Sequence, residues 1–401
     1  MSPTLAIVSL IGLVVGHAAL AVWFLSQVHG YGLSPRWMNR FSAVPLVLPA
    51  LIAVAMAWLI LARPVAAWPT AATAYACLCM TVAYVILPAI TLHRNLRREP
   101  RGVTTRSEAA VLELPEGGSR AWIGDGPHAW LLRLPGNEAL TLDWKTCEVR
   151  HPALPRSFGP LRILHLSDFH FARCYDPRYF EAVAEAASGW DADLVLFTGD
   201  LLDADDALDW TGPVLGRLRG RLGQYAILGN HDVVHRPGRV RRALRAAGFA
   251  VIDGRWTTIE DGDRTIALGG TSYPWGPALD HDARPDADAT IVLSHSPDLF
   301  PRIARWGTVD LILAGHNHGG QVRLPWIGPV VMPSRYGRRY DRGFYRRGRT
   351  ILEVTQGVGG RHPIRYGCPP EIVRLTLMPA GLPAHPSASS VALMSDSTSR
   401  T

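Results

Sequence analysis

The pattern of hydrophobic and polar residues divides the chain into an apolar N-terminal quarter and a mixed remainder. Three apolar stretches, at about 4–26, 41–61 and 68–92, each approach the ~20 residues that a helix needs to cross a bilayer. From residue 161 onward, short apolar runs of strand length alternate with stretches of helical spacing. The pattern therefore predicts an α-helical transmembrane segment followed by an α/β domain.

The charged residues support a membrane anchor and indicate its orientation. Residues 1–92 contain no Asp, Glu or Lys, and their only Arg residues are Arg36, Arg40 and Arg63. No basic residue precedes the first stretch, which is also longer than a signal-peptide core, so we expect it to be retained. The arginines after the third stretch are Arg94, Arg97, Arg98 and Arg101. Three crossings put both Arg-rich sides together, which predicts a multi-pass protein of the inner (cytoplasmic) membrane whose α/β domain is cytoplasmic.

Composition shifts suggest four parts. We expect a transmembrane anchor at 1–101, a small β-rich connecting element at 102–157, an α/β domain at 158–378 and a disordered Pro/Ala/Ser-rich tail at 379–401. The β-rich element is predicted from alternating apolar and polar residues at 111–114, 130–134 and 140–142.

Within the α/β part, most predicted strands end in a cluster of Asp, His, Asn and Gly. The strands are expected at 161–166, 194–197, 225–228, 291–293 and 311–313, with helices at 177–190, 210–222 and 237–248. Further β-like runs follow at 321–324, 350–355 and 371–377. Because buried strands of α/β proteins carry their sites at the carboxyl ends, these clusters should lie along one edge.

Charge and cysteine content exclude some functions without naming one. The net charge is +7, but 40 of the 41 basic residues are Arg and only Lys145 is Lys. So uniform a choice is typical of genome composition, so the net charge by itself is no evidence for nucleic-acid binding, and we do not expect nucleic acid as a partner. The five Cys form no zinc-type or disulfide pattern. A run of seven Arg with aromatic residues at 335–349 is typical either of a surface for anionic lipid or of a solvated hairpin.

Five strand-end clusters contain the candidate chemistry. They are Asp168-Phe169-His170, Gly199-Asp200, Gly229-Asn230-His231-Asp232, Ser294-His295-Ser296 and Gly315-His316-Asn317-His318. Each alone is a weak signal, but their conjunction behind successive strands predicts a metal site. Carboxylate, amide and imidazole ligands without thiolate favour Mn, Fe or Zn over a structural zinc site. The glycines that precede ligands allow the backbone to approach the ions.

This ordered set resembles the signature of the calcineurin-like metallophosphoesterase superfamily. The resemblance covers about 162–377, and the segments 319–325, 357–359, 363–365 and 370–371 are similar to the membrane-tethered bacterial YaeI/YkuE group. Asn317 stands where most of that group carries Thr. The resemblance implies a four-layer α/β-β/α sandwich and a dinuclear-metal phosphoric ester hydrolase that uses a metal-bridging hydroxide.

The same resemblance implies a role for each motif residue. Two divalent ions, with Mn favoured and Fe or Zn as alternatives, would be held by Asp168, His170 and His318, by Asn230, His295 and His316, and by Asp200 as the bridge. His231 would bind a phosphoryl oxygen or protonate the leaving oxygen, with Asp232 orienting it.

Four further residues are candidates for a role at the site, and for three of them a structural role fits equally well. Arg365 and Gln321 lie in stretches similar to the family's and are candidate substrate-binding residues, but Arg365 equally fits a packed arginine at a strand end. Asp203 and Asp205 either orient ligands from behind or belong to a solvated loop and helix start.

The favoured hypothesis is a membrane-anchored phosphoesterase that hydrolyses phosphodiester or pyrophosphate bonds of a lipid-linked substrate. Soluble nucleotides are an alternative substrate class. A non-catalytic docking module on the same fold is the rival from another class, and it usually loses metal ligands, which are intact here. A transporter would need acidic partners in the spans, and residues 1–92 have none. The sequence leaves open the natural substrate, monoesterase or diesterase preference and the oligomeric state.

Overall fold

The computed structural model describes residues 3–31, 44–113, 115–116, 118–234 and 236–382. Arg36, Arg40, the first residues of the second apolar stretch (41–43) and the predicted disordered segment 383–401 lie outside the described residues.

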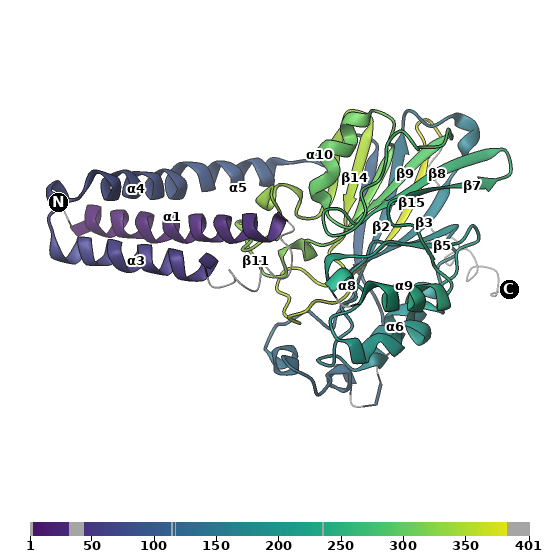
Figure 1. Cartoon of the computed structure of the whole chain (residues 1–401), viewed down its shortest axis with the longest axis horizontal. Coiled ribbons are helices and arrows are strands. Elements are labelled where there is room, and N and C mark those ends of the chain that lie inside the picture. Colours follow the sequence, from purple (N-terminus) through teal and green to yellow (C-terminus); the bar gives the residue numbers. More distant parts are fainter. Residues whose placement is uncertain (1–2, 32–43, 114, 117, 235, 383–401) are drawn as a thin grey trace, which may run out of the picture.

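The N-terminal part is a bundle of apolar helices that projects from the α/β domain (Figure 1). It contains α1 (Pro3–Gly30), α3 (Val44–Ala62), α4 (Thr70–Thr81), η2 (Val82–Ile86) and α5 (Leu87–Leu96). Large apolar side chains along these helices are exposed, among them Leu10, Val54 and Val85. Segments Pro3–Gln27 and Thr70–Leu96 are long and apolar enough to cross a membrane, whereas the apolar part of α3, Val47–Ala62, is shorter. Length and composition thus permit a crossing by the first and last segments, and the crossing of a membrane by each of the three stretches stays a prediction.

The last span is not a regular helix. Between α4 and α5 the chain makes one wider π-helical turn at η2, directly before Pro88 in the first turn of α5. Pro88 has no N–H to donate to the carbonyl four residues earlier, so a local widening of the helix at this point has a covalent cause.

Two sheets form the α/β domain. The seven-stranded sheet has the order β1-β2-β15-β3-β4-β5-β6, with β1 (Val103–Ala109), β2 (Asp143–His151), β15 (Glu371–Pro379), β3 (Leu161–Leu166), β4 (Leu194–Phe197), β5 (Gln224–Ala226) and β6 (Ala250–Val251). The six-stranded sheet has the order β13-β14-β10-β9-β8-β7, with β13 (Gly343–Arg347), β14 (Thr350–Val354), β10 (Leu311–Ala314), β9 (Ala289–Ser294), β8 (Arg264–Thr271) and β7 (Arg255–Asp261). The inner pairs β3·β4, β4·β5, β9·β10 and β10·β14 are parallel.

Consecutive side chains of a strand point to opposite faces of its sheet, so their packing shows which layer covers each face. In β4, Leu194 and Leu196 join the core between the sheets, while Val195 and Phe197 pack on the opposite face. That outer core also takes side chains from α6 (Pro177–Ser188), α7 (Thr211–Leu215) and α9 (Pro237–Ala246). On the other sheet, Ile312 packs against α10 (Phe300–Ile303). Helices, sheet, sheet and helices thus form the expected four-layer α/β-β/α sandwich.

Some predicted secondary structure is wrong in detail. Residues 129–133 form a 3-10 helix rather than a strand, because Ala129 and Leu132, three residues apart, both face the core after one 3-10 turn. The helix expected at 210–222 ends as α7 at Leu215. The strands of 102–157 are β1 and β2, and β2 pairs in parallel with β15, so they extend the seven-stranded sheet.

The single lysine joins the two sheets at a buried ion cluster. Lys145 Nζ of β2 lies 3.0 Å from Glu353 Oε1 of β14 and 3.4 Å from Glu371 Oε1 of β15. The other oxygen of Glu353 lies 2.8 Å from His165 Nδ1. Buried carboxylates need such partners, so Lys145 fixes β2 against the core.

Candidate metal centre

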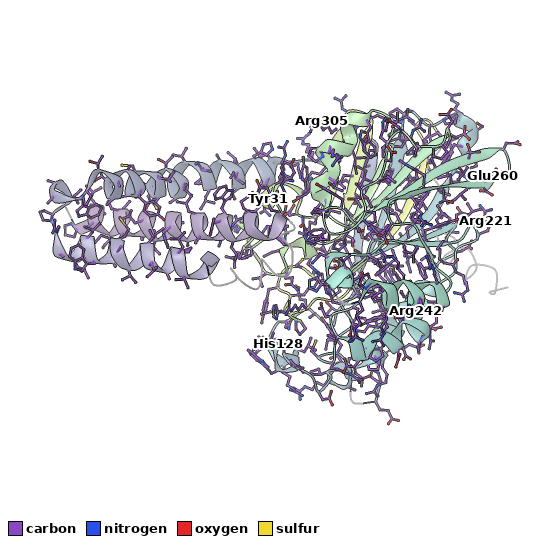
Figure 2. The ribbon with its side chains drawn as sticks, viewed as in Figure 1. Tyr31, His128, Arg221, Arg242, Glu260 and Arg305 are labelled. Carbon is purple, nitrogen blue, oxygen red and sulfur yellow. The ribbon has the colours of Figure 1, made fainter. Side chains whose placement is uncertain are left out.

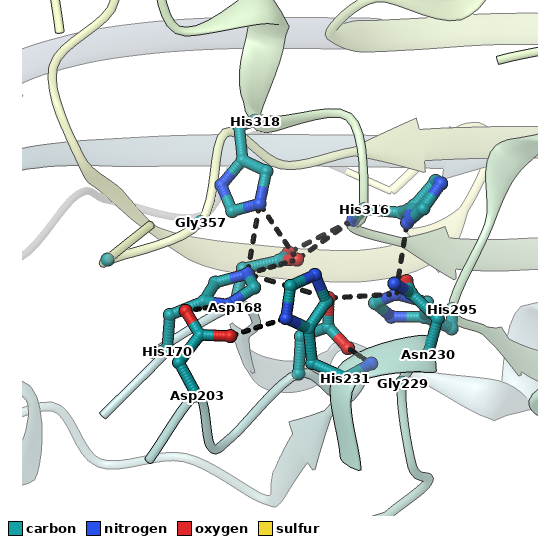
Figure 3. Close-up of polar contacts among 12 residues, drawn as sticks. Asp168, His170, Asp203, Gly229, Asn230, His231, His295, His316, His318 and Gly357 are labelled. Atoms are coloured by element: carbon teal, nitrogen blue, oxygen red, sulfur yellow. Dashed lines mark hydrogen bonds and ion pairs between the residues drawn. The ribbon is translucent and has the colours of Figure 1, made fainter. Parts of the chain in front are cut away.

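The strand-end residues of both sheets converge at one point (Figure 3). Asp168 follows β3, Asp200 follows β4, and Asn230 begins the short helix α8 (Asn230–Val234) after β5. From the other sheet, His295 follows β9 and His316 follows β10. Parallel strands end at the same edge of their sheet, so five chain segments deliver polar side chains to one buried place.

One group of candidate ligands contains Asp168, His170 and His318. The Nε2 atoms of the two histidines are 3.0 Å apart. His318 Nε2 lies 3.6 Å from Asp168 Oδ1, and His170 Nε2 lies 3.7 Å from the same oxygen. Three donor atoms therefore point at a common position.

A second group contains Asp200, His295 and His316. His295 Nε2 lies 3.2 Å from His316 Nδ1 and 3.0 Å from Asn230 Oδ1. Asp200 Oδ2 lies 3.4 Å from His295 Nε2 and 3.5 Å from His170 Nε2. The Asp200 carboxylate thus stands between the two groups.

The backbone is unusual at these ligands. Asp168, His170, Asp200, His316 and His318 all have positive φ, between 46° and 69°. Residues other than glycine rarely adopt this conformation, and it persists where the surrounding structure enforces it, commonly at functional sites.

Glycine is required beside the ligands because the chain segments nearly touch. A Cβ at Gly229 would collide with the Asp200 carboxylate, and one at Gly315 would collide with the Asp168 carboxylate. Any side chain there would displace a ligand, which agrees with the expectation that these glycines allow close approach.

Hydrogen bonds behind the imidazoles turn their free nitrogens toward the centre. His295 Nδ1 lies 2.8 Å from the Thr198 carbonyl oxygen, and His316 Nε2 lies 3.0 Å from that of Pro333. Burial, followed by the neighbouring His295, lowers the pKa of His316 to about 3, and burial lowers the pKa of His318 to about 3. Neutral imidazoles are the form that binds metal, and burial holds His316 and His318 in that form. Against the effect of burial, the Asp203 charge raises the pKa of His170, and the Asp200 charge raises the pKa of His295 to about 9. These two imidazoles would release a proton when a cation takes its place beside the same carboxylates, so the donor set fits divalent cations.

The expected partner of His231, the Asp232 carboxylate, faces away from the His231 ring. Asp232 accepts from the amides of Leu201 and Leu202, at 2.9 and 3.1 Å, and from Gly229 N at 2.9 Å. It supports the backbone of the Asp200 loop and does not orient His231. Burial and the nearby Asp200 charge raise the Asp232 pKa to about 7.

Asp203 contacts two histidines instead. One of its oxygens lies 3.0 Å from His170 Nδ1, and the other hydrogen-bonds His231 Nδ1. Its side chain is only 7% exposed, so of the two interpretations for Asp203 the orienting one agrees with the geometry. Asp205 is 40% exposed and pairs with Arg236 at 3.5 Å.

Arg365 and Gln321 do not project into the centre as free phosphate-binding groups. Arg365 is 1% exposed, and its Nη2 donates to the Gly359 carbonyl at 2.6 Å and lies 3.4 Å from His318 Nδ1. These contacts agree with the second interpretation of Arg365, a packed arginine at a strand end. The Gln321 amide donates to the His362 carbonyl at 3.1 Å. Both side chains instead hold the 357–365 loop against the metal motif.

Sequence reasoning missed Trp275. Its ring centroid lies 4.9 Å from that of His316 and 5.8 Å from that of His295. Trp275 comes shortly after β8, the neighbour of β9 in the sheet. Its position just beyond the end of a strand is the feature of the sequence that could have identified it as a site residue.

Comparisons with known proteins identify a family model and several relatives that match the chain. Residues 161–320 match the family model described as calcineurin-like phosphoesterase. The chain is 31% identical over 245 residues to the uncharacterized metallophosphoesterase YkuE of Bacillus subtilis, covering 57% of this chain and 83% of the relative. It is 30% identical over 226 residues to the phosphodiesterase YaeI of Escherichia coli, covering 55% of this chain and 83% of the relative.

A more distant relative is named for a pyrophosphatase activity. The UDP-2,3-diacylglucosamine pyrophosphatase LpxG of Chlamydia muridarum is 23% identical over 292 residues, covering 58% of this chain and 86% of the relative.

Proposed function

Because the chain belongs to the calcineurin-like metallophosphoesterase family, we propose that it is a membrane-anchored phosphoesterase that uses two divalent metal ions. The match confirms the resemblance inferred from the strand-end motifs, and the family model is described as a phosphoesterase, which supports a phosphoric ester hydrolase. The proposal adds the number of ions, the anchoring, the kind of bond and the substrate class.

The observation that supports this function best is the paired ligand arrangement. Asp168, His170 and His318 form one group and Asp200, His295 and His316 another, with Asn230 beside the second. We assign one ion to each group, with Asp200 shared and manganese as the favoured metal. Bound ions of this kind supply Lewis-acid activation of water and neutralise charge on a phosphoryl group.

The chain's own residues contribute proton handling and orientation. His231 is 23% exposed, and its ring centroid lies 4.7 Å from that of His170. A partly accessible imidazole at the rim of the ligand set suits donation of a proton to the leaving oxygen. Asp203 holds the Nδ1 side of that ring, so it acts as a positioning residue.

A lipid-linked phosphodiester or pyrophosphate is the proposed substrate class. Exposed apolar helices α1 and α4–α5 support placement in a membrane, and a relative is named for hydrolysis of UDP-2,3-diacylglucosamine. We place the α/β domain on the cytoplasmic side of the inner membrane, because Arg94, Arg97 and Arg98 lie at the domain end of α5. Reporter fusions at the C-terminus test this placement, and a periplasmic signal would overturn it.

Hydrolysis of bis-p-nitrophenyl phosphate by the detergent-solubilised full chain tests the catalytic proposal. With Mn²⁺, wild type should turn over, and Asp200→Asn should lose at least about 100-fold in kcat because the shared carboxylate charge is lost. Asp209→Asn, on an exposed helical turn, is the matched control and should retain wild-type activity. Equal, metal-independent rates for all three proteins would favour a non-catalytic docking module.

Two further measurements test the finer parts. Elemental analysis of protein loaded with Mn²⁺ should find about two ions per chain, whereas one ion would refute the dinuclear assignment. A panel of lipid-linked pyrophosphates, phospholipids and cyclic nucleotides should show preference for lipid-linked substrates. A preference for cyclic nucleotides would favour the soluble alternative.

A further inference from the structure

A basic cavity of about 430 Å³ lies where the helical bundle meets the α/β domain. Its walls are the end of α5 and the hairpin formed by β11 (Arg323–Leu324) and β12 (Gly328–Pro329), beside the base of the bundle in Figure 1. We call it the junction pocket. The candidate metal ligands are not among its lining residues, so it is separate from the site described above.

Arg94 reaches into the junction pocket from the end of α5. Its Nη2 donates to the Trp326 carbonyl at 3.2 Å, and its Nη1 lies 3.7 Å from Asp341 Oδ2. The side chain is 18% exposed, yet its buried Nε has no hydrogen-bond partner among the described residues. An arginine held with unused donor capacity is typical of a site for an external acceptor.

Gly328 makes room for this arginine. It has φ +87°, and a Cβ at this position would collide with the Arg94 guanidinium. Glycine is therefore required both for the turn and for the approach of Arg94 to the hairpin.

The lining of the junction pocket carries more positive than negative charge. It has four arginines, Arg94, Arg97, Arg323 and Arg342, but one carboxylate, Asp341. The Glu99 carboxylate, outside the lining, interacts with Arg97, so two positive charges remain in excess. Asp341 already accepts from Arg323 Nη2 at 2.9 Å and from the Tyr345 hydroxyl at 2.8 Å. Both terminal nitrogens of Arg97 and of Arg323 also donate within the protein, so these two arginines are held in place and contribute charge. A fixed cluster of guanidinium groups matches the oxygens of a phosphate.

The rim of the junction pocket is apolar and exposed. Trp326, Ile327 and Leu324 at the tip of the hairpin are 83%, 47% and 46% exposed. They lie at the domain end of the bundle, where α5 leaves its apolar stretch. Tryptophan beside arginine at the end of a membrane helix is typical of the headgroup region of a bilayer.

We propose that the junction pocket binds the phosphate of an anionic phospholipid headgroup from the leaflet that surrounds the ends of α1 and α5. The arginines pair with the phosphate oxygens, and Trp326 and Ile327 lie at the boundary between headgroups and acyl chains. This inference rests on the proposed membrane placement, but it does not require hydrolysis or metal. Free phosphate shares the phosphate chemistry and lacks the acyl chains that the rim would contact.

Native mass spectrometry of the detergent-solubilised full chain, without divalent metal, tests the proposal with phosphatidylglycerol as the probe. Wild type should bind it more tightly than phosphatidylcholine. Arg94→Gln should weaken binding about tenfold (about 1.4 kcal/mol). Gly328→Ala keeps every charge but displaces Arg94, so it should weaken binding to a similar extent. Arg242→Gln, on the exposed face of α9 away from the bundle (Figure 2), should bind as wild type does.

Three results would overturn the proposal: wild-type affinity in both Arg94→Gln and Gly328→Ala, equal binding of phosphatidylcholine, or displacement of the lipid by an equal concentration of inorganic phosphate. Circular dichroism identifies a misfolded variant, and the other variant then decides. Because the assay involves no turnover, loss of lipid binding leaves the catalytic proposal intact. Conversely, an inactive wild type that binds the lipid would refute only the catalytic proposal.

Discussion

Asp203→Asn tests the assignment of Asp203 as the carboxylate that orients two histidines. In the structure, one oxygen lies 3.0 Å from His170 Nδ1 and the other contacts His231 Nδ1. A carboxylate accepts hydrogen bonds at both oxygens, whereas an amide accepts at one and donates at the other. In the variant, one histidine must therefore lose its bond or change its tautomer.

The size of the effect follows from the two contacts. Loss of the partner behind a metal-binding histidine costs about 10- to 100-fold in metal affinity or activity, so the Mn²⁺ concentration that gives half-maximal activity should rise by that factor. Proton transfer by a positioned group contributes about 10²–10⁴-fold. The kcat at saturating Mn²⁺ should therefore stay at least about tenfold below wild type, an increase in activation free energy of about 1.4 kcal/mol.

The assay is hydrolysis of bis-p-nitrophenyl phosphate across a Mn²⁺ titration, with kcat and KM determined separately. KM should change little, because the Asp203 side chain is only 7% exposed and both of its oxygens contact histidines. Asp205→Asn is the matched control, because this residue lies two positions along the same loop and its side chain is 40% exposed. Wild-type kcat and Mn²⁺ dependence in Asp203→Asn, or an equal loss in Asp205→Asn, would refute the reasoning.

The remaining predictions concern stability and metal removal. Lys145→Met leaves Glu353 and Glu371 buried without their cation and should lower the free energy of unfolding by about 3–5 kcal/mol; an unchanged denaturation midpoint would contradict this. Leu313→Ala opens a cavity between the sheets and should cost about 2–5 kcal/mol, whereas Val111→Ala, at a 93% exposed side chain, should stay within about 0.5 kcal/mol. Chelation should abolish hydrolysis and lower the thermal midpoint, and Mn²⁺ should restore both, because a ligand that binds only the native state stabilises it; a midpoint insensitive to chelator would count against the metal assignment.

The positions of inner strands and the identity of the family could be predicted from local sequence. The run Leu194–Phe197 is a strand with the predicted bounds, because four consecutive apolar residues before Gly199-Asp200 fit a strand buried on both faces and little else. The ordered motifs at the strand ends identified the family because each motif is short and contiguous.

Contacts between distant segments could not be predicted in this way. Asp232 is adjacent to His231 in the chain, yet its carboxylate turns to the amides of Leu201 and Leu202, and Asp203 reaches the ring from another strand end. The burial of Arg365 against His318 is likewise a matter of how two loops meet.

The sequence by itself determined the apolar N-terminal helices, the inner strands and the set of candidate ligands, because each depends on hydrophobic periodicity or on residues close together in the chain. Only the tertiary structure decided that β1 and β2 extend the main sheet, which carboxylate orients His231 and that Arg94 meets Trp326 across 232 positions of sequence. Such pairs are selected by the packing of the whole domain. No local pattern encodes which of many similar side chains will be neighbours once the chain is folded.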